Sequence, residues 1–405
     1  MSRRSRLTRR NLLKGATAAA CAGPLVVAAE TFGANDRIHL AGIGLGGRGR
    51  YVFGSLARHS DVQPVAVCDV MGRRRKPFKA KGLAVYCDYR EMLARGDIDA
   101  VTVATPTQWK PLHTVAAAKA GADVYCEKPS SLTIGNGRAM VRAVRRYGRI
   151  FQHGTQQRSA GEFRFACEMV RSGRVGRLKH VEVYVGGPPH PCNLPGEPCP
   201  PDIDWNLWLG PAPWRPFNHR ICLQGWEGYR AFSGGGMTGW GSHHFDIAQW
   251  GLAADDTGPV EILPPGTDGR PGVTFRYTCG TAVHHMNRMG DWAVVFVGEE
   301  GQVAVNRGKL RTWPASLARE KTRADEVHLY RSDNHGGNFL WAIRHRRPAA
   351  ADVETAHRTM SVCHLGNIAF DLRRPLKWDP AAERFPGDAQ ANRLLDRPMR
   401  SPWVL

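Results

Sequence analysis

The sequence predicts an N-terminal α/β domain with a parallel sheet, followed by a second domain organised around another sheet. Three observations favour this order. Apolar strand-like segments alternate with helical segments between residues 37 and 147, and a glycine-rich loop follows the first strand. Beyond residue 178, shorter segments alternate polar and apolar residues between Gly-rich turns. The first pattern is typical of βαβ units and the last of strands with one buried face.

The composition indicates a globular protein with a basic surface. Of 405 residues, 42% are apolar and 9% aromatic, which suffices for a large core and two domains. Lys and Arg number 56 against 36 Asp and Glu, a net charge of +20. These basic residues are dispersed and no aromatic-interleaved basic helix accompanies them, so we expect no nucleic-acid partner. No apolar run reaches about 18 residues, so we expect no stable membrane insertion.

The N-terminus resembles a twin-arginine export signal. Arg9-Arg10 and Leu12-Leu13 precede an Ala-rich run that ends in small residues at Ala28-Ala29. A disordered basic tail is the alternative. The ordered succession of charge, apolar segment and small residues favours a signal peptide over residues 1–34 and a periplasmic protein.

The first strand, residues 37–43, leads into a Gly-x-Gly-x-x-Gly loop. Its three glycines serve a tight turn, close approach to a pyrophosphate, and helix–strand packing. The following helix would direct its N-terminus at the phosphates. The loop residues assigned to the cofactor are Gly44, Gly46, Gly47, Arg48 and Gly49.

The second strand, residues 63–68, ends in Asp69, which lies 20 positions beyond Gly49. A carboxylate there binds the hydroxyls of an adenosine ribose and repels a 2′-phosphate, so the sequence favours NAD over NADP. Arg73 and Arg74 lie close enough to temper this preference, although we expect them to be solvated helix residues.

Two further strands, residues 100–104 and 122–126, end in chemically informative residues. Thr105-Pro106 follows the first, and Glu127-Lys128-Pro129 follows the second. Helices are expected at 89–93, 113–120 and 137–147. Because parallel strands end at one edge of a sheet, these residues should face the glycine loop. With Trp109 they complete the predicted cofactor site.

These motifs together resemble the Gfo/Idh/MocA family of glucose-fructose oxidoreductase and inositol dehydrogenase, and its exported twin-arginine branch most closely. The second domain adds Gly234-Gly235-Gly236 and the stretch from Gly239 to Asp246. The resemblance implies a Rossmann domain and a mostly antiparallel open β-sheet domain, with NAD(P) bound between them. It also implies redox chemistry on a sugar or polyol. The expected domains are a signal peptide (1–34), the Rossmann domain (35–152), a substrate and oligomerisation domain (153–380) and a packed tail (381–405).

The second domain shows strand patterns at 178–185, 272–278, 292–297 and 302–306, and a helix at 351–372. The Pro- and Trp-rich residues 186–214 are expected to form either an ordered loop wrapped on the sheet or a wall of the substrate cleft.

The resemblance assigns catalysis to Lys128 and His243. The imidazole would act as general base, since its ordinary pKa lies near neutrality, and the lysine would hold the same oxygen. The substrate-binding residues assigned in the same way are Arg158, Trp240, His244 and Asp246. For Asp246 a capping carboxylate at a helix start is an equal alternative.

Two positions depart from the family pattern. Gly239 stands where relatives carry Asp, and Lys110 where they carry His. Three functions therefore compete: an NAD(P)-dependent oxidoreductase of sugars, polyols or glycosides; an NAD-retaining glycoside hydrolase or lyase using transient oxidation and elimination; and a catalytically impaired sugar-binding homologue. A homo-oligomer formed through the C-terminal sheet is possible.

No metal site is expected, because the chain has no Cys-x-x-Cys and His243-His244 lack a third ligand at helical spacing. Among the ten cysteines, Cys192 and Cys199 share the Pro-rich loop and are candidates for a disulfide.

Overall fold

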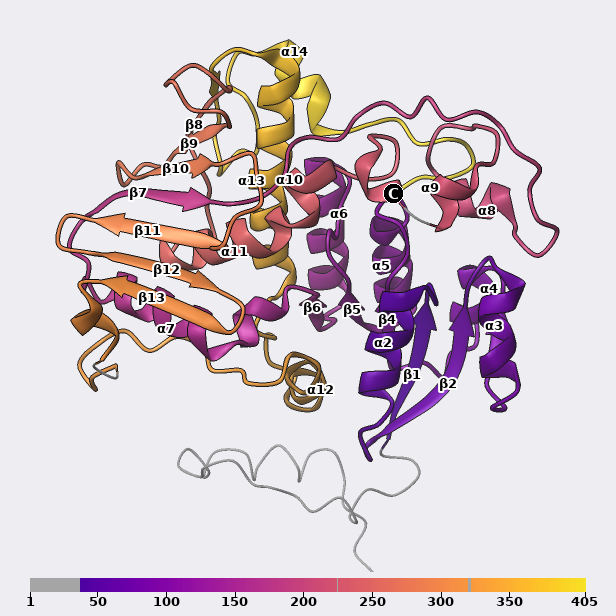
Figure 1. Cartoon of the computed structure of the whole chain (residues 1–405). Helices are drawn as coiled ribbons and strands as arrows, with labels where there is room; N and C mark the ends of the chain where they lie inside the picture. The colour runs from indigo at the N-terminus through magenta and orange to yellow at the C-terminus, as the bar shows by residue number, and fades with distance from the viewer. Residues whose placement is uncertain (1–36, 224, 320–321) are drawn as a thin grey trace, which may run out of the picture. The chain divides into compact units, whose positions relative to one another are not determined.

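The computed structural model describes residues 37–405 except 224, 320 and 321, and Ile38–Leu405 form one compact unit (Figure 1). The predicted signal peptide with Arg9 and Arg10 lies outside the described residues. Among the described helices, none has the length and apolar character needed to cross a membrane.

The first sheet is a six-stranded parallel sheet in the order β3-β2-β1-β4-β5-β6. The predicted parallel domain is therefore confirmed. Its strand order reverses between β1 and β4, where open α/β sheets bind ligands at the carboxyl ends of the strands. The strands are β1 (Ile38–Ile43), β2 (Val62–Cys68), β3 (Ala84–Tyr86), β4 (Ala100–Val103), β5 (Asp123–Cys126) and β6 (Phe151–His153).

Helices cover both faces of this sheet, because β1, β4 and β5 are apolar and almost wholly buried. Thr133 caps the helix after β5 by accepting a hydrogen bond from the amide of Asn136 at 3.1 Å. The helices are α2 (Gly47–Leu56), α3 (Gly72–Lys79), α4 (Tyr89–Leu93), α5 (Lys110–Lys119) and α6 (Ile134–Arg146).

The second sheet has eight strands in the order β13-β12-β11-β7-β10-β9-β8-β14. Only β7 and β10 pair in parallel, so the sheet is mostly antiparallel, as expected. Its strands are β7 (Leu178–Val183), β8 (Glu261–Leu263), β9 (Thr274–Arg276), β10 (Ala282–His285), β11 (Val294–Gly298), β12 (Gln302–Asn306), β13 (Lys309–Trp313) and β14 (Leu376–Lys377).

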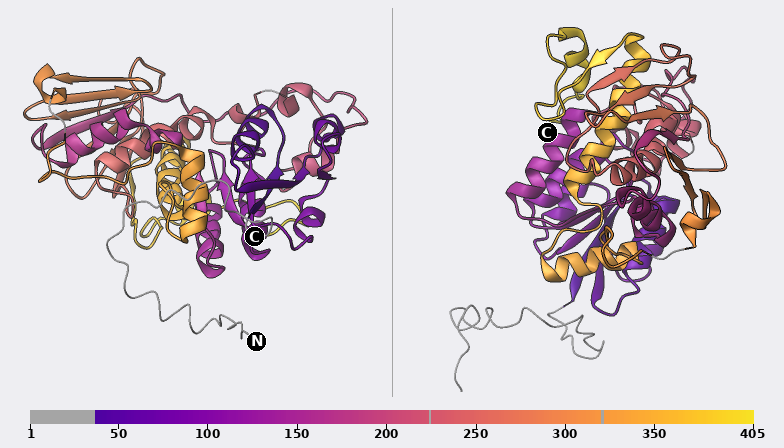
Figure 2. Two further views of the ribbon diagram at one scale, coloured as in Figure 1. Left: turned by 90° about the horizontal axis from the view of Figure 1, so that it is seen from below. Right: turned by 90° about the vertical axis from the view of Figure 1, so that its left-hand side faces the viewer.

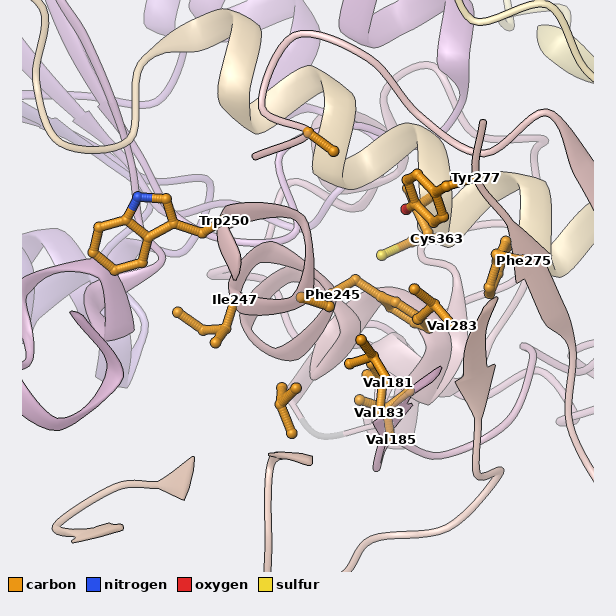
Figure 3. Packing of buried hydrophobic residues seen from close by; sticks show 14 of the residues in the cluster. Val181, Val183, Val185, Phe245, Ile247, Trp250, Phe275, Tyr277, Val283 and Cys363 are labelled. Carbon is orange, nitrogen blue, oxygen red and sulfur yellow. The ribbon is translucent and has the colours of Figure 1, made fainter. Parts of the chain in front are cut away.

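Three helices bury one side of this sheet: α7 (Gly161–Arg171), α11 (Gly241–Gly251) and α13 (Val353–Leu372). Figure 3 shows part of this core, in which Phe245 of α11 lies between Cys363 of α13 and the valines Val181 and Val183 of β7. This core fixes the position of α11, which carries His243. The remaining α-helices are α8 (Trp205–Leu209), α9 (His219–Leu223), α10 (Gly235–Gly239), α12 (His335–His345) and α14 (Ala389–Asn392).

Two segments that follow the Rossmann domain in sequence contribute to its cores. Phe339 and Leu340 of α12 pack with β1 and α2, within the range 153–380 that we had assigned to the second domain. At the end of the chain, which returns to the Rossmann domain (Figures 1 and 2), Trp403 meets the Trp109 ring edge-on with centroids 4.6 Å apart.

Candidate active site

The glycine loop is shaped so that only glycine fits at two of its positions. Gly44 has φ of +87°, and a Cβ there would lie 2.8 Å from the carbonyl carbon of Ala104. A Cβ on Gly49 would lie 1.8 Å from the oxygen of Gly44. The loop therefore brings bare backbone to the N-terminus of α2, whose free amides and positive dipole end suit a pyrophosphate.

Asp69 follows β2 and faces this loop. Its carboxylate accepts hydrogen bonds from the amides of Leu45 at 2.7 Å and Met71 at 2.9 Å. Arg74 lies 3.6 Å away, so it is an ion-pair partner of Asp69 and not the solvated residue that we expected. The ribose position thus carries one carboxylate and one guanidinium.

A cavity of about 280 Å³ opens over the loop and Asp69. Thr105, Pro106 and Trp109 line it, as the sequence analysis predicted for the cofactor site. The other wall lies partly in residues 186–214, for which a wall of the substrate cleft was one of the two expectations. It comes from the Pro- and Trp-rich part of the second domain and consists of Leu207, Trp208, Cys222, Leu223, Trp226 and Glu227.

We call residues 202–227 the covering segment. It is bound to the Rossmann domain by backbone and side chain, since Gly72 N donates to Asp202 O at 2.8 Å and Arg73 pairs with the Asp202 carboxylate at 2.8 Å. Trp109 Nε1 donates to the carbonyl of Leu207 at 2.9 Å. The segment therefore packs on the Rossmann domain and lines the cavity, whereas a loop wrapped on the sheet was one of the two placements expected for residues 186–214. No local pattern specifies such a long-range contact.

Glu127 joins the Lys128 turn to the glycine loop. Arg48 Nε donates to its carboxylate at 2.7 Å, and Gln156 Nε2 donates to the same oxygen at 3.2 Å. The side chain is buried beside Gly154, where a Cβ would meet Glu127 Cδ at 2.8 Å. Two residues assigned to the cofactor, Arg48 and Glu127, thus form one ion pair at the edge of the sheet.

Lys110 lies beneath this turn with 1% of its surface exposed. Its Nζ donates to the carbonyl oxygens of Lys128 at 2.8 Å and Pro129 at 3.0 Å. Burial lowers the pKa of Lys110 to about 8. The lysine that stands where relatives are expected to carry His therefore holds the backbone of the turn with Lys128.

His243 lies on α11 and is 3% exposed. Burial lowers its pKa well below the ordinary value, and the neighbouring charges of Lys128 and Arg307 lower it further. The imidazole is therefore neutral at neutral pH, as a base must be. Lys128 is partly exposed, and its positive charge is one of those that lower the pKa of His243.

Trp240 and His244 flank His243. The Trp240 ring centroid lies 5.7 Å from that of His243 and 5.4 Å from that of His244. His244 Nδ1 donates to the carbonyl of Tyr184 at 2.8 Å, and burial lowers the pKa of His244 to about 4. Nε2 of His244 is buried and has no hydrogen-bond partner among the described residues.

Arg158 and Asp246 do not reach a substrate cleft, in contrast to our expectation. Both are buried, and Arg158 Nε donates to the Asp246 carboxylate at 2.8 Å. Thr155 and Thr359 donate to the same carboxylate at 3.1 and 2.9 Å, so its acceptor positions are occupied within the protein. Asp246 also lies inside α11 and does not cap its start. The pair joins the end of the Rossmann domain to α11 and α13.

Within the described part of the chain, no group of three or more His, Cys, Asp or Glu side chains is arranged to hold a metal ion. Cys192 and Cys199 are free thiols here, so the structure does not form the candidate disulfide.

The fold, the glycine loop and Asp69 after β2 define a two-domain dinucleotide-binding protein. The chain belongs to the Gfo/Idh/MocA oxidoreductase family. Residues 38–155 match the model of its NAD-binding Rossmann fold, and residues 189–405 match the model of its C-terminal alpha/beta domain.

Curated relatives include D-glucoside 3-dehydrogenase from Escherichia coli, which is 30% identical over 31% of this chain and 35% of its own length. A glycosyl hydrolase family 109 protein from Stenotrophomonas maltophilia is 27% identical over 41% of this chain and 40% of its own. For three other curated relatives, the matched region covers only 45%, 57% and 31% of the relative's own length.

Among solved structures, the fold resembles that of the WlbA dehydrogenase from Chromobacterium violaceum in complex with NADH and UDP-GlcNAcA. The TM-score is 0.62 with 18% identity, over 85% of this chain and 96% of that one.

Proposed function

We propose that the protein is an NAD(P)-dependent oxidoreductase acting on a hydroxyl of a sugar, polyol or glycoside. The observation that carries this proposal is the buried, neutral His243 of α11, whose pKa the charge of Lys128 helps to lower, in a chain that also forms the glycine loop and Asp69 of a dinucleotide site. The two residues come from different domains of the described chain.

The chain's own residues would supply the proton chemistry. When bound, the nicotinamide accepts a hydride from the carbon that carries the hydroxyl. His243 takes the hydroxyl proton, for which its lowered pKa keeps it unprotonated. Lys128 donates a hydrogen bond to the same oxygen and stabilises the negative charge that develops there. The product is the corresponding carbonyl compound.

NAD is the expected cofactor and NADP the less favoured one. Asp69, fixed by two backbone amides, suits the hydroxyls of an unphosphorylated ribose. Arg74 reduces the repulsion that Asp69 would exert on a 2′-phosphate.

A second candidate is redox-neutral glycoside cleavage with a retained cofactor. The covering segment favours it, because it closes one wall of the cofactor cavity and is bound to the Rossmann domain by backbone hydrogen bonds and an ion pair. The family 109 glycosyl hydrolase among the relatives points the same way. In this reaction oxidation of a ring hydroxyl, elimination of the aglycone, addition of water and re-reduction return the cofactor to its starting state.

Purified protein separates these functions. Released nucleotide and absorbance of the reduced nicotinamide establish whether a dinucleotide is bound. Matched polyols and aryl glycosides are then incubated with and without added NAD. Carbonyl product that depends on added NAD supports the oxidoreductase, and aglycone release without added NAD supports redox-neutral cleavage. Sugar binding without turnover in either assay would contradict both and leave the sugar-binding homologue.

Periplasmic localisation by twin-arginine export and a homo-oligomer formed through the C-terminal sheet complete the proposal. Replacing Arg9 and Arg10 by Lys should retain the precursor in the cytoplasm, as fractionation would show. Light scattering on the purified protein tests the oligomer, and a monomer would contradict it.

A further inference from the structure

Gly239 lies four residues before His243 and has open space beside it. Gly239 is buried, yet apart from its chain neighbours and the backbone of its own helix no atom lies within 4 Å of the place where a Cβ would be. It ends α10, and Trp240 continues the helical backbone into α11, with His243 N donating to Trp240 O at 2.9 Å. Residues 239 and 243 are thus four apart along helical backbone and lie on the same face.

The side of His243 that needs a partner has none within the described chain. Its Nδ1 is buried and makes no hydrogen bond to any described residue. A buried polar atom without a partner is costly, so native structures rarely leave one unsatisfied. The chain provides space beside this histidine but no side chain to fill it.

The charges around this space are cationic. The Arg307 guanidinium, in the turn between β12 and β13, lies 5.0 Å from the centroid of the Trp240 ring. Glu162 holds this turn by accepting a hydrogen bond from Gly308 N at 2.9 Å. Among the described residues, neither Arg307 nor Lys128 forms an ion pair.

Glu127, the carboxylate that follows β5, does not neutralise Arg307 or Lys128. Glu127 is already bound by Arg48 at 2.7 Å and by Gln156 at 3.2 Å. Arg307 remains charged on an aromatic face at the edge of the site, where a guanidinium suits a carboxylate ligand.

We propose that the substrate is an acidic carbohydrate, a uronic acid or a glycoside of one, whose carboxylate occupies the space at Gly239 and pairs with Arg307. The inference rests on the proposed function, because it takes His243 to mark the substrate site. The substrate then brings the negative charge that the family resemblance led us to expect in the protein at this position. A fixed Asp would repel such a substrate, which accounts for a glycine here.

Binding to the cofactor-loaded protein tests this without requiring turnover. The probes are matched pairs that differ only at the sixth carbon: 4-nitrophenyl glucuronide with the glucoside, and the corresponding galacturonide with the galactoside. We expect the acidic member of at least one pair to bind about 10-fold more tightly by calorimetry, or more, with the preference shrinking at high salt.

Three variants sharpen the test. Arg307→Gln should remove the preference and leave binding of the neutral member unchanged. Gly239→Asp should reverse the preference, whereas Gly239→Asn, of the same size but uncharged, should not. Arg307 is exposed and Gly239 has free space, so we expect all three to fold.

Equal or tighter binding of the neutral members in the native protein, or an unchanged preference in both Arg307→Gln and Gly239→Asp, would overturn the acidic substrate. Turnover of neutral sugars alongside such a result would leave the proposed oxidoreductase intact. Failure of every sugar to bind would overturn both.

Discussion

Lys110 Nζ lies 2.8 Å from the carbonyl oxygen of Lys128, so one lysine orients the backbone of the other. The donor comes from the first turn of α5 and the acceptor from the turn after β5. From the sequence, Lys110 was a departure from the family pattern, standing where relatives carry His. The structure makes it a positioning residue for the turn that carries Lys128.

Lys110 should make the free energy of unfolding depend on pH in the alkaline range. Its pKa is lowered to about 8 in the fold, against an ordinary value of 10.5, so the unfolded chain binds more protons between these pH values. The free energy of unfolding should therefore rise with pH across this window. Lys110→Met should lose this contribution, and Lys119→Met, an exposed lysine on the same helix, should keep it. Urea unfolding at pH 7.5, 9 and 10 measures the effect; identical pH dependence in native protein and Lys110→Met would contradict it.

Lys128 and His243 should act as one unit. Lys128→Ala and His243→Ala should each lower turnover by roughly 10²-fold or more, and the double variant should lose much less than the product of the two. Because burial and Lys128 lower the pKa of His243, kcat/KM should stay level as the pH falls through 6.5. His345→Ala, at an exposed position, is the control. Full activity of His243→Ala with cofactor bound would redirect the search to His244 and Lys110.

Asp69 and Arg74 should set nucleotide choice in opposite directions. Asp69→Ser should weaken NAD binding and relax discrimination against NADP, because the ribose hydroxyls lose their acceptor. Arg74→Gln should strengthen discrimination, since Asp69 would lose its neutralising partner at 3.6 Å. Fluorescence titration with both nucleotides gives the ratios. Equal affinity of the native protein for NAD and NADP would show that Asp69 does not select the ribose.

Buried neutral histidines should make the fold sensitive to acid. Burial lowers the pKa of His113, His153 and His364 to about 3, against an ordinary value of 6.5. The unfolded chain therefore takes up protons that the fold does not, and stability should fall as the pH drops below 6.5. His153→Leu should lower the slope of the unfolding free energy against pH, relative to the exposed-site control His345→Gln. The decrease should correspond to the uptake of about one proton on unfolding. Urea unfolding between pH 7.5 and 5 gives the slope, and an unchanged slope in His153→Leu would count against this origin.

The sequence by itself determined the parallel α/β domain, the alternating strands of the second domain and the residues of the glycine loop. These features follow from short-range rules: strand and helix periodicity, the φ that Gly44 requires, and the position of Asp69 directly after its strand. Lys128 and His243 were identified by motif, through resemblance to relatives.

Only the tertiary structure decided what surrounds those residues. It placed the covering segment over the cofactor cavity, buried Arg158 against Asp246, and set Arg307 over Trp240. Each relationship joins residues distant in sequence, and an arginine has the same local pattern whether it binds a ligand, pairs inside the core or faces water. Its role follows from which surfaces the packing of the two sheets brings together, and packing is a property of the whole chain.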